Sequence, residues 1–302
     1  MTAQAWHLIL DGTNPAAYNM AVDEALLQEA TSVWTALTYL RFFQWARPTL
    51  SLGFSQKSAR VVDFAFCRER GIELVRRITG GKAVLHHHEL TYSIVSNDAR
   101  FFPLDDIGET YRRIALALVL GFRHLGIETS LAGEVNSRGQ MPRSPATSAC
   151  FALSNHHEIL CSGRKLVGSA QRRTKTAFLQ HGSILLDFDP DLLAGALGPC
   201  SADLGAQVAS LTACLGRRPE PDELSLHLQR GIREFFGVDL VRTSLDAKQR
   251  QVAQDLACTK YAQLDWSAVS HAKSEVQFSD SAETKAGLWA SKRSCLDSAK
   301  MA

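Results

Sequence analysis

The fold of this chain is decided by three segments: SACF at 148–151, EILCSGRKLVGSAQRR at 158–173 and FLQHGSILLDF at 178–188. The second segment predicts a β-hairpin, with apolar strands at Glu158–Leu160 and Lys165–Val167 around the turn residues Ser162-Gly163. The third segment predicts a buried strand over Ser183–Phe188, into which His181-Gly182 leads. Consecutive short strands of this kind indicate a sheet built from hairpins.

The same segments contain a thiol, an amine and small residues that together could form an acyl-transfer site. A thiolate is the strongest ordinary nucleophile at neutral pH, and a nearby ammonium lowers the pKa of a thiol because it favours the anion. Cys150 and Lys165 are the candidate pair, and Gly168-Ser169-Ala170 are small enough to let a ligand approach the backbone. On spacing alone, a buried structural cysteine and a solvated lysine fit these positions too.

Composition places the chain among ordinary globular proteins. Its 302 residues are 45% hydrophobic and 21% charged, which provides apolar material for a large core. The net charge of +2 excludes a dominant polyanion-binding role. Seven cysteines without regular spacing predict reduced thiols in a cytoplasmic protein rather than a disulfide framework. Neither a signal peptide nor a membrane-spanning run is expected from the sequence.

A basic, glycine-rich turn, RRITGGK at 76–82, is the second candidate binding element. Glycine lets the backbone approach a ligand, and successive N–H groups can form an anion-binding nest. The turn is not a P-loop, because Arg76 stands where a P-loop has its first glycine and Ala83 where it has Ser or Thr. A tight turn with a solvated basic rim fits the same residues.

His86 and His88 share one face of a predicted strand because they are two positions apart. Such a pair could ligate zinc, but no third or fourth ligand follows at an obvious spacing. A polar pocket wall is therefore the preferred interpretation, and no metal site is predicted.

Hydrophobic periodicity predicts helices between the strand clusters. Asn14-Pro15 is expected to begin a helix that ends near Ala30, with Asn14 as its cap, and Ser244 is expected to cap a last helix reaching about Tyr261. Hairpins without repeated βα units predict an α+β fold, with a central mixed, mostly antiparallel sheet flanked by helices. Further helices are expected at 63–70, 109–125, 190–197 and 222–236, and further strands at 39–43, 49–52, 73–77, 83–86 and 90–95.

Five motifs occur in an order that resembles the biotin/lipoate protein ligase family: NMAVDEALL at 19–27, RFFQWARPTLSLGFSQ at 41–56, RRITGGKAVLH at 76–86, GRKLVGSAQ at 163–171 and LQHGSILLD at 179–187. The resemblance implies the catalytic domain of that family over residues 1–266. Residues 267–302 are rich in Ser, Ala and Lys with weak periodicity, and a poorly ordered C-terminal tail is expected there.

Within that family the chain is most similar to the cysteine-dependent octanoyltransferases of the LipM type. ATP-dependent lipoate ligases usually carry three glycines after the paired arginines, where this chain has Gly80-Gly81-Lys82. The LipM type has its nucleophile at the position of Cys150, and the family's K-x-x-G-S-A lysine falls on Lys165. The resemblance therefore implies that Cys150 and Lys165 are catalytic. It implies substrate-binding residues at Arg77, Thr79, Gly80, Gly81, Lys82, His86, Gly168, Ser169, Ala170, His181 and Gly182.

The activity that the resemblance implies is transfer of an octanoyl group from octanoyl-acyl carrier protein to a lysine of a lipoyl domain, by way of an acyl-Cys150 thioester. The implied acceptor is the glycine cleavage H protein or an E2 subunit, with no cofactor, nucleic acid or membrane involved. A basic rim at Arg76, Arg77 and Lys82 would suit acidic protein partners. Val84 and Leu85 are expected to line the acyl slot.

Three other activities fit the same residues. An amidotransferase that moves octanoyl between lipoyl domains would use the same cysteine and lysine. An ATP-dependent lipoate-protein ligase is the second alternative. A non-catalytic protein that binds acyl carriers or lipoyl domains is the third, and the presence of both Cys150 and Lys165 argues against it.

Overall fold

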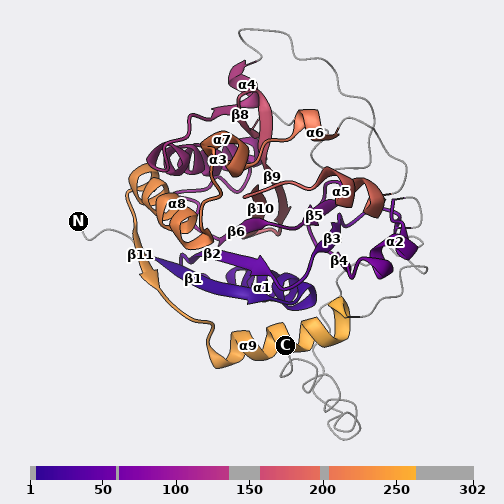
Figure 1. Ribbon diagram of the computed structural model, residues 1–302. Coiled ribbons are helices and arrows are strands. Elements are labelled where there is room, and N and C mark those ends of the chain that lie inside the picture. The colour runs from indigo at the N-terminus through magenta and orange to yellow at the C-terminus, as the bar shows by residue number, and fades with distance from the viewer. Residues whose placement is uncertain (1–4, 59–60, 136–156, 198–203, 263–302) are drawn as a thin grey trace, which may run out of the picture. The chain divides into compact units, whose positions relative to one another are not determined.

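The computed structural model describes residues 5–58, 61–135, 157–197 and 204–262 (Figure 1). All of them belong to one structural unit, Met1–Leu264, and the second unit, Asp265–Ala302, lies outside the described residues. The expected tail at 267–302 and the candidate nucleophile Cys150 also lie outside them, so both stay predictions. Within the described residues, the structure contains no helix that is long and apolar enough to cross a membrane.

Two sheets organise the described part of the chain. Their strands are β1 (Ala5–Asn14), β2 (Thr38–Trp45), β3 (Thr49–Leu52), β4 (Glu73–Arg76), β5 (Val84–His86), β6 (Glu89–Ser96), β7 (Ser130–Leu131), β8 (Ile159–Cys161), β9 (Arg164–Arg173), β10 (Phe178–Leu185) and β11 (Asp239–Arg242). The large sheet has the order β11-β1-β2-β6-β10-β9-β8-β7, and the small sheet has the order β4-β3-β5. Parallel pairing joins β1 to β11 and β2, and β3 to β4, whereas the other pairs are antiparallel. The predicted α+β class with a mixed, mostly antiparallel sheet is confirmed.

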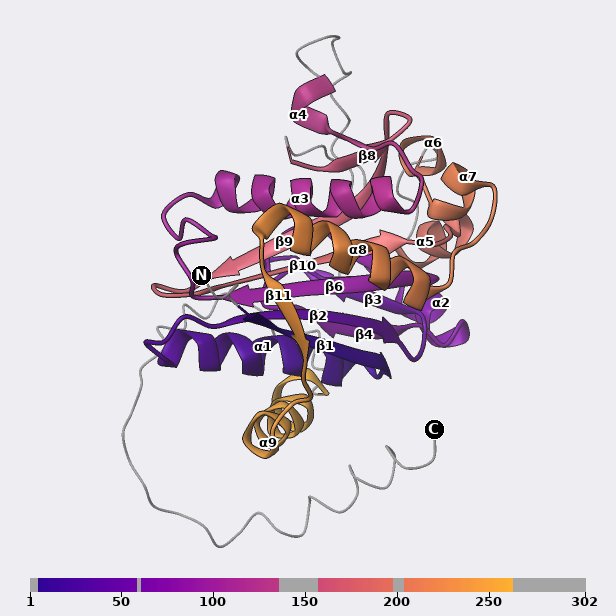
Figure 2. The ribbon, with the colours of Figure 1, turned by 90° about the vertical axis from the view of Figure 1, so that its left-hand side faces the viewer.

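Helices cover both faces of the large sheet. They are α1 (Ala16–Ser32), α2 (Phe64–Glu69), α3 (Ile107–His124), α4 (Ala132–Val135), α5 (Pro190–Leu197), α6 (Leu204–Gln207), α7 (Leu211–Leu215), α8 (Pro221–Phe236) and α9 (Ala247–Leu256), which continues into a π-helix over Ala257–Tyr261. Figure 2 shows α3 and α8 on one face of the sheet, with α1 and α9 on the other.

The large sheet separates two large clusters of the hydrophobic core. Successive strand residues point to opposite faces, so Phe42 of β2 packs in the cluster under α3 and α8 while Phe43 packs in the cluster under α1. Burial of one such side chain contributes about 1.5–3 kcal/mol. The α3–α8 side is closed by a tight helix crossing, where a Cβ on Gly231 would lie 2.3 Å from the backbone N of Gly121.

Two helix starts differ from the prediction. Asn14 does not cap α1, because it is the last residue of β1 and its side-chain amide donates to the Asp11 carbonyl over 2.8 Å. Asp246 rather than Ser244 caps α9, and it forms a capping box in which Gln249 reciprocates. In both cases the helix lies where periodicity predicted it, and only the capping residue differs.

The hairpin strands are longer than predicted. The turn at Ser162-Gly163 is confirmed, but β9 continues to Arg173, so Gly168-Ser169-Ala170 lie inside a strand rather than after it. Likewise, β10 begins at Phe178 and contains His181-Gly182. The reason is mutual pairing of the two strands, in which His181 lies opposite Ala170.

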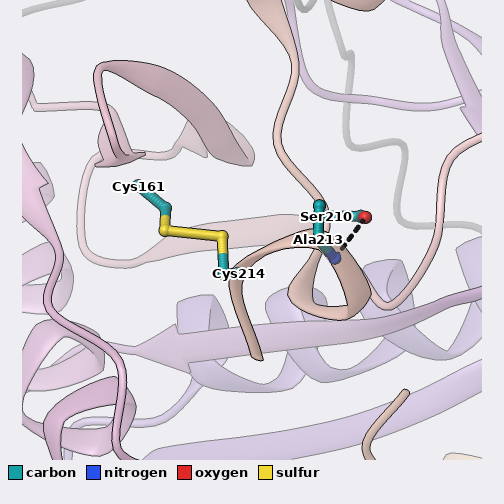
Figure 3. The surroundings of a disulfide bond; sticks show 4 residues. All are labelled: Cys161, Ser210, Ala213 and Cys214. Carbon is teal, nitrogen blue, oxygen red and sulfur yellow. Dashed lines mark hydrogen bonds between the residues drawn. A yellow bond between two sulfur atoms is a disulfide. The ribbon is translucent and has the colours of Figure 1, made fainter. Parts of the chain in front are cut away.

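A disulfide joins Cys161 of β8 to Cys214 of α7, with Cα atoms 6.9 Å apart (Figure 3). The expectation of reduced thiols throughout is therefore wrong for this pair. The two cysteines are 53 residues apart in sequence, so no local spacing pattern indicated the bond. The disulfide fixes α7 against the hairpin that contains Lys165.

Candidate active site

Seven of the predicted substrate-binding residues line one pocket, to which both sheets contribute: Arg77, His86, Gly168, Ser169, Ala170, His181 and Gly182. The sequence had not indicated most of the other lining residues, which are Met20, Trp45, Ser51, Val84, Thr91 and Ser183. Val84 was expected to line an acyl slot and does line this pocket. Its neighbour Leu85 is buried but is not among the lining residues of the described pocket.

Arg77 lies beneath the glycine-rich turn and is only 3% exposed. Its Nε donates to Thr79 Oγ1 over 3.1 Å, and its Nη1 donates to the Ser51 carbonyl and to Ser51 Oγ, each over 3.0 Å. Its Nη2 donates to the carbonyls of Gly80 and Lys82 over 2.8 and 2.7 Å. All five N–H donors of the guanidinium therefore have acceptors. The expected role of Arg77 in an exposed basic rim is wrong, because its charge is used inside the protein.

A chain of hydrogen bonds leads from Arg77 to a buried carboxylate in α1. Thr79 Oγ1 accepts from Arg77, so its own hydrogen is available to His181 Nε2, which lies 2.8 Å away. The opposite ring nitrogen, Nδ1, then carries a hydrogen toward Asp23 Oδ2, 3.0 Å away. This pattern of donors assigns a neutral imidazole to His181.

A second chain of the same kind reaches a carboxylate in β6. Ser51 Oγ accepts from Arg77 and lies 2.7 Å from His86 Nε2, while His86 Nδ1 lies 2.8 Å from Glu89 Oε1. Both ring nitrogens of His86 are thus used, so His86 is not available to hold a metal together with His88. In the described residues no group of three or more His, Cys, Asp or Glu side chains is placed to hold a metal ion.

Burial and charge determine the protonation of His181 and Asp23 in the first of these hydrogen-bond chains. It lowers the pKa of His181 below the ordinary value, more than the hydrogen bond and charge of Asp23 raise it. Burial alone would raise the pKa of Asp23, but the hydrogen bond from His181 and the charge of Arg41 outweigh it, so that pKa is lowered. Arg41 Nη1 lies 2.9 Å from Asp23 Oδ1, and this ion pair satisfies the carboxylate without a charged histidine.

Glycine is required where the turn meets β3. A Cβ on Gly53 would lie 2.0 Å from the carbonyl oxygen of Gly81, and Gly81 itself has φ of 92°. The exposed edge beside this contact contains Phe54, whose ring lies 5.6 Å from the guanidinium carbon of Arg172 on β9. An aromatic ring and a cation therefore meet where the turn faces β9.

Gly182 provides space for the polar contacts on the other side of the pocket. A Cβ there would lie 2.5 Å from Tyr92 Cε1 and 2.6 Å from Ser169 Oγ. The Tyr92 hydroxyl lies 2.8 Å from Ser169 Oγ and accepts from Gln180 Nε2 over 3.0 Å. Ser169 is thus held by a buried tyrosine whose pKa is raised by burial.

Lys165 is also buried, at 4% exposure, but it is not among the residues that line this pocket in the described part of the chain. Its ammonium forms an ion pair with the carboxylate of Glu158, which precedes β8. Glu158 was predicted to begin a strand, and no functional role was predicted for it. Its only signal was a carboxylate at the start of an otherwise apolar strand.

Asp23 and Glu89 are the other residues that the sequence did not single out. Asp23 falls on the same helical face as Met20 and Leu27, and an acid on an apolar face was the available signal for it. Glu89 follows three histidines, and nothing in its local pattern indicated that it would be buried.

Comparison with known proteins identifies the family. Residues 15–233 match the model of the lipoyl protein ligase A/B catalytic domain. The chain belongs to that family. It is 38% identical to octanoyltransferase LipM of Moorella thermoacetica over 274 residues, 88% of this chain and 98% of that protein. It is 37% identical to octanoyltransferase LipM of Kyrpidia tusciae over 87% of this chain and 98% of that protein. The predicted family and the predicted octanoyltransferase activity are confirmed.

Solved structures of the lipoyl protein ligase family share the fold. A lipoate-protein ligase A bound with ATP superposes with a TM-score of 0.72 at 24% identity, over 87% of this chain and 98% of that chain. A bipartite lipoate protein ligase from Thermoplasma acidophilum superposes with a TM-score of 0.68 at 24% identity, over 87% and 96%. The expected biotin/lipoate ligase-like architecture is therefore confirmed.

The buried His181 predicts that this family domain loses stability in mild acid. The folded-state pKa of His181 is lowered, so below about pH 6.5 the unfolded chain binds a proton that the folded chain excludes. The free energy of unfolding should fall as pH decreases through that range. Replacing the ring by His181→Gln should flatten the fall, as measured by urea unfolding between pH 7.5 and 5.

The half-buried His87 also has a pKa lowered by burial, so part of the slope should remain in that variant. His124→Gln, at a histidine paired with Glu234 on the surface, is the control and should keep the full slope. Equal slopes in wild type and His181→Gln would contradict a neutral, buried His181.

Proposed function

We propose that this chain moves an octanoyl group from octanoyl-acyl carrier protein to a lysine of a lipoyl-domain protein, through a thioester on Cys150. The observation that supports this best is the pocket that both sheets line, in a chain similar to octanoyltransferases over 88% of its length. The acceptor is either the glycine cleavage H protein or an E2 subunit, and one solved relative is described together with its E2 lipoyl domain.

Two acyl transfers make up the reaction. First, the Cys150 thiolate attacks the thioester carbonyl, so that a new sulfur–carbon bond forms and the carrier leaves as a thiolate. Second, the neutral amine of the acceptor lysine attacks the Cys150 thioester, a nitrogen–carbon bond forms, the carbon–sulfur bond breaks, and the amine proton neutralises the sulfur. Thioester exchange is close to balance and amide formation is downhill, so neither ATP nor a cofactor is required.

Each step passes through a tetrahedral oxyanion that needs hydrogen-bond donors. The proposal assigns this role to Lys165 and to backbone N–H groups of β9. At Gly168-Ser169-Ala170 the strand has passed the end of β8, and β10 is the described strand that pairs with these residues. The proposal is that the other edge of β9 offers its backbone donors to the substrate there, because Gly168, Ser169 and Ala170 line the pocket.

The carbonyls of Gly80 and Lys82 accept hydrogen bonds from Arg77. These bonds support the view that the turn forms a rigid wall of the pocket. Substrate contacts at Thr79, Gly81 and Lys82 belong to the proposal.

A cytoplasmic location remains the expectation from the cysteine pattern, and the Cys161–Cys214 disulfide is the observation against it.

The proposal predicts octanoylation without ATP or magnesium. Incubation with octanoyl-acyl carrier protein should add one octanoyl group to the enzyme, mapping to the peptide that contains Cys150, and a lipoyl domain should then accept it. Intact-mass and peptide mass spectrometry measure both steps. Cys150→Ala should abolish them, whereas Cys258→Ala, at an exposed thiol, should not.

Two results would overturn this assignment. One is full transfer by Cys150→Ala. The other is efficient labelling of the acceptor by free octanoate or lipoate with ATP, when octanoyl-acyl carrier protein gives none; the chain would then be a ligase.

The proposal also predicts that the charge of Lys165 matters for the chemical step. Lys165→Met keeps most of the buried aliphatic chain but removes the ammonium, and loss of one oxyanion donor typically costs about two to three orders of magnitude in rate. Lys165→Arg keeps a charge in a bulkier shape and should recover only part. Single-turnover octanoylation measures the rate, and Lys260→Met, at an exposed lysine paired with Glu24, is the control. Rates for Lys165→Met within a few-fold of wild type would contradict the role.

A further inference from the structure

We propose that Glu158 is the positioning residue for Lys165, holding its ammonium in one place through a buried ion pair. This inference rests on the proposed function, because it concerns the lysine to which that function gives a catalytic role. The inference adds the Glu158 carboxylate to the proposed role of Lys165.

The ion pair is enclosed. The side chain of Lys165 is 4% exposed and that of Glu158 is 13% exposed. A buried ammonium without a counter-charge favours the neutral amine, because burial penalises the charged form. The carboxylate of Glu158 supplies that counter-charge directly at the ammonium of Lys165.

The backbone fixes both partners. The Lys165 carbonyl accepts from the Ala209 N–H over 2.8 Å, and Lys165 forms a parallel bridge with Val208. The Glu158 carbonyl accepts from the Ala132 N–H over 2.9 Å. Neither residue can move far without breaking a main-chain contact, so the ammonium and the carboxylate meet in one defined geometry.

A β-bulge directs the lysine. Leu160 lies opposite Lys165, but Ile159 lies opposite Val167, so two steps along β9 match one step along β8. The extra residue, Leu166, is fully buried in the core together with Val167. A bulge re-aims the neighbouring side chain and is common beside active sites. Here it coincides with the one lysine that the sequence marked as catalytic.

The surroundings do not supply another carboxylate in the pocket that Glu158 lines. The titratable residues lining that described pocket beside Glu158 are Tyr92, Tyr111 and His157. Arg164 precedes Lys165 on β9 and lies opposite Cys161 in the hairpin. Among the residues that line this pocket, Glu158 supplies the carboxylate that pairs with Lys165.

The test replaces Glu158 by Gln, which keeps the shape and removes the charge, and by Asp, which keeps the charge on a shorter stem. Two quantities are measured from pH 5 to 10: the single-turnover octanoylation rate and the rate of Cys150 alkylation by iodoacetamide. Circular dichroism at each pH establishes that every variant is folded.

With Glu158→Gln, the alkylation curve should move to higher pH by about one unit, and octanoylation at pH 7 should fall by about tenfold or more, because the lysine loses the ion pair that holds its ammonium in place to favour the thiolate. Glu158→Asp should recover part of both. Glu223→Gln, which removes a carboxylate paired with Arg217 on the surface, should leave both curves unchanged. In a Lys165→Met background, Glu158→Gln should cause no further shift, since Glu158 acts through the lysine.

A folded Glu158→Gln variant with wild-type curves would overturn the proposal, and so would a variant that reacts faster than wild type. A shift of equal size in the Lys165→Met background would overturn it as well. Failure of the proposed function looks different: wild type would not be acylated by octanoyl-acyl carrier protein at all, whereas the alkylation curves would still report on Glu158 and Lys165.

Discussion

The guanidinium of Arg77 is buried, and the site depends on the way its charge is compensated. Two carboxylates, Asp23 and Glu89, are linked to it without touching it; each is reached through a hydroxyl and an imidazole, and Asp23 also forms an ion pair with Arg41. One chain ends in helix α1 and the other in strand β6, so a single side chain ties both sheets and a helix together. A buried charge that lost these partners would carry its full desolvation penalty.

The rigidity of the pocket follows from this arrangement. The turn over Arg77 is held by two of its own carbonyls, and Gly53 allows that turn to lie against β3. The buried ammonium of Lys165 is compensated in a similar way, because it forms an ion pair with the carboxylate of Glu158. Side chains held on strands in this way are preorganised, because they need not rearrange when a ligand enters the pocket.

Periodicity and motif order predicted most of the fold and the membership of the pocket. Strand 49–52 and helix 190–197 lie as predicted, because each is a local apolar pattern with clear ends. Strands β1 and β11 were missed, since their pairing joins segments that lie far apart in the sequence. The positions of Arg77 and Glu158 depend on contacts far away in sequence or across a bulge, which no local pattern records. Basic residues beside glycines predicted an exposed basic rim, whereas Arg77 is buried in the structure.

Hydrogen exchange of the turn amides in Arg77→Lys, combined with the octanoylation rate, tests most directly whether Arg77 supports the site. Lysine keeps the charge but has three donors in place of five, so the carbonyls of Gly80 and Lys82 should lose partners. Exchange at residues 80–82 should quicken by about tenfold and octanoylation should slow, while Arg100→Lys, at an exposed ion pair, should change neither. Unaltered exchange together with a wild-type rate in Arg77→Lys would contradict the account.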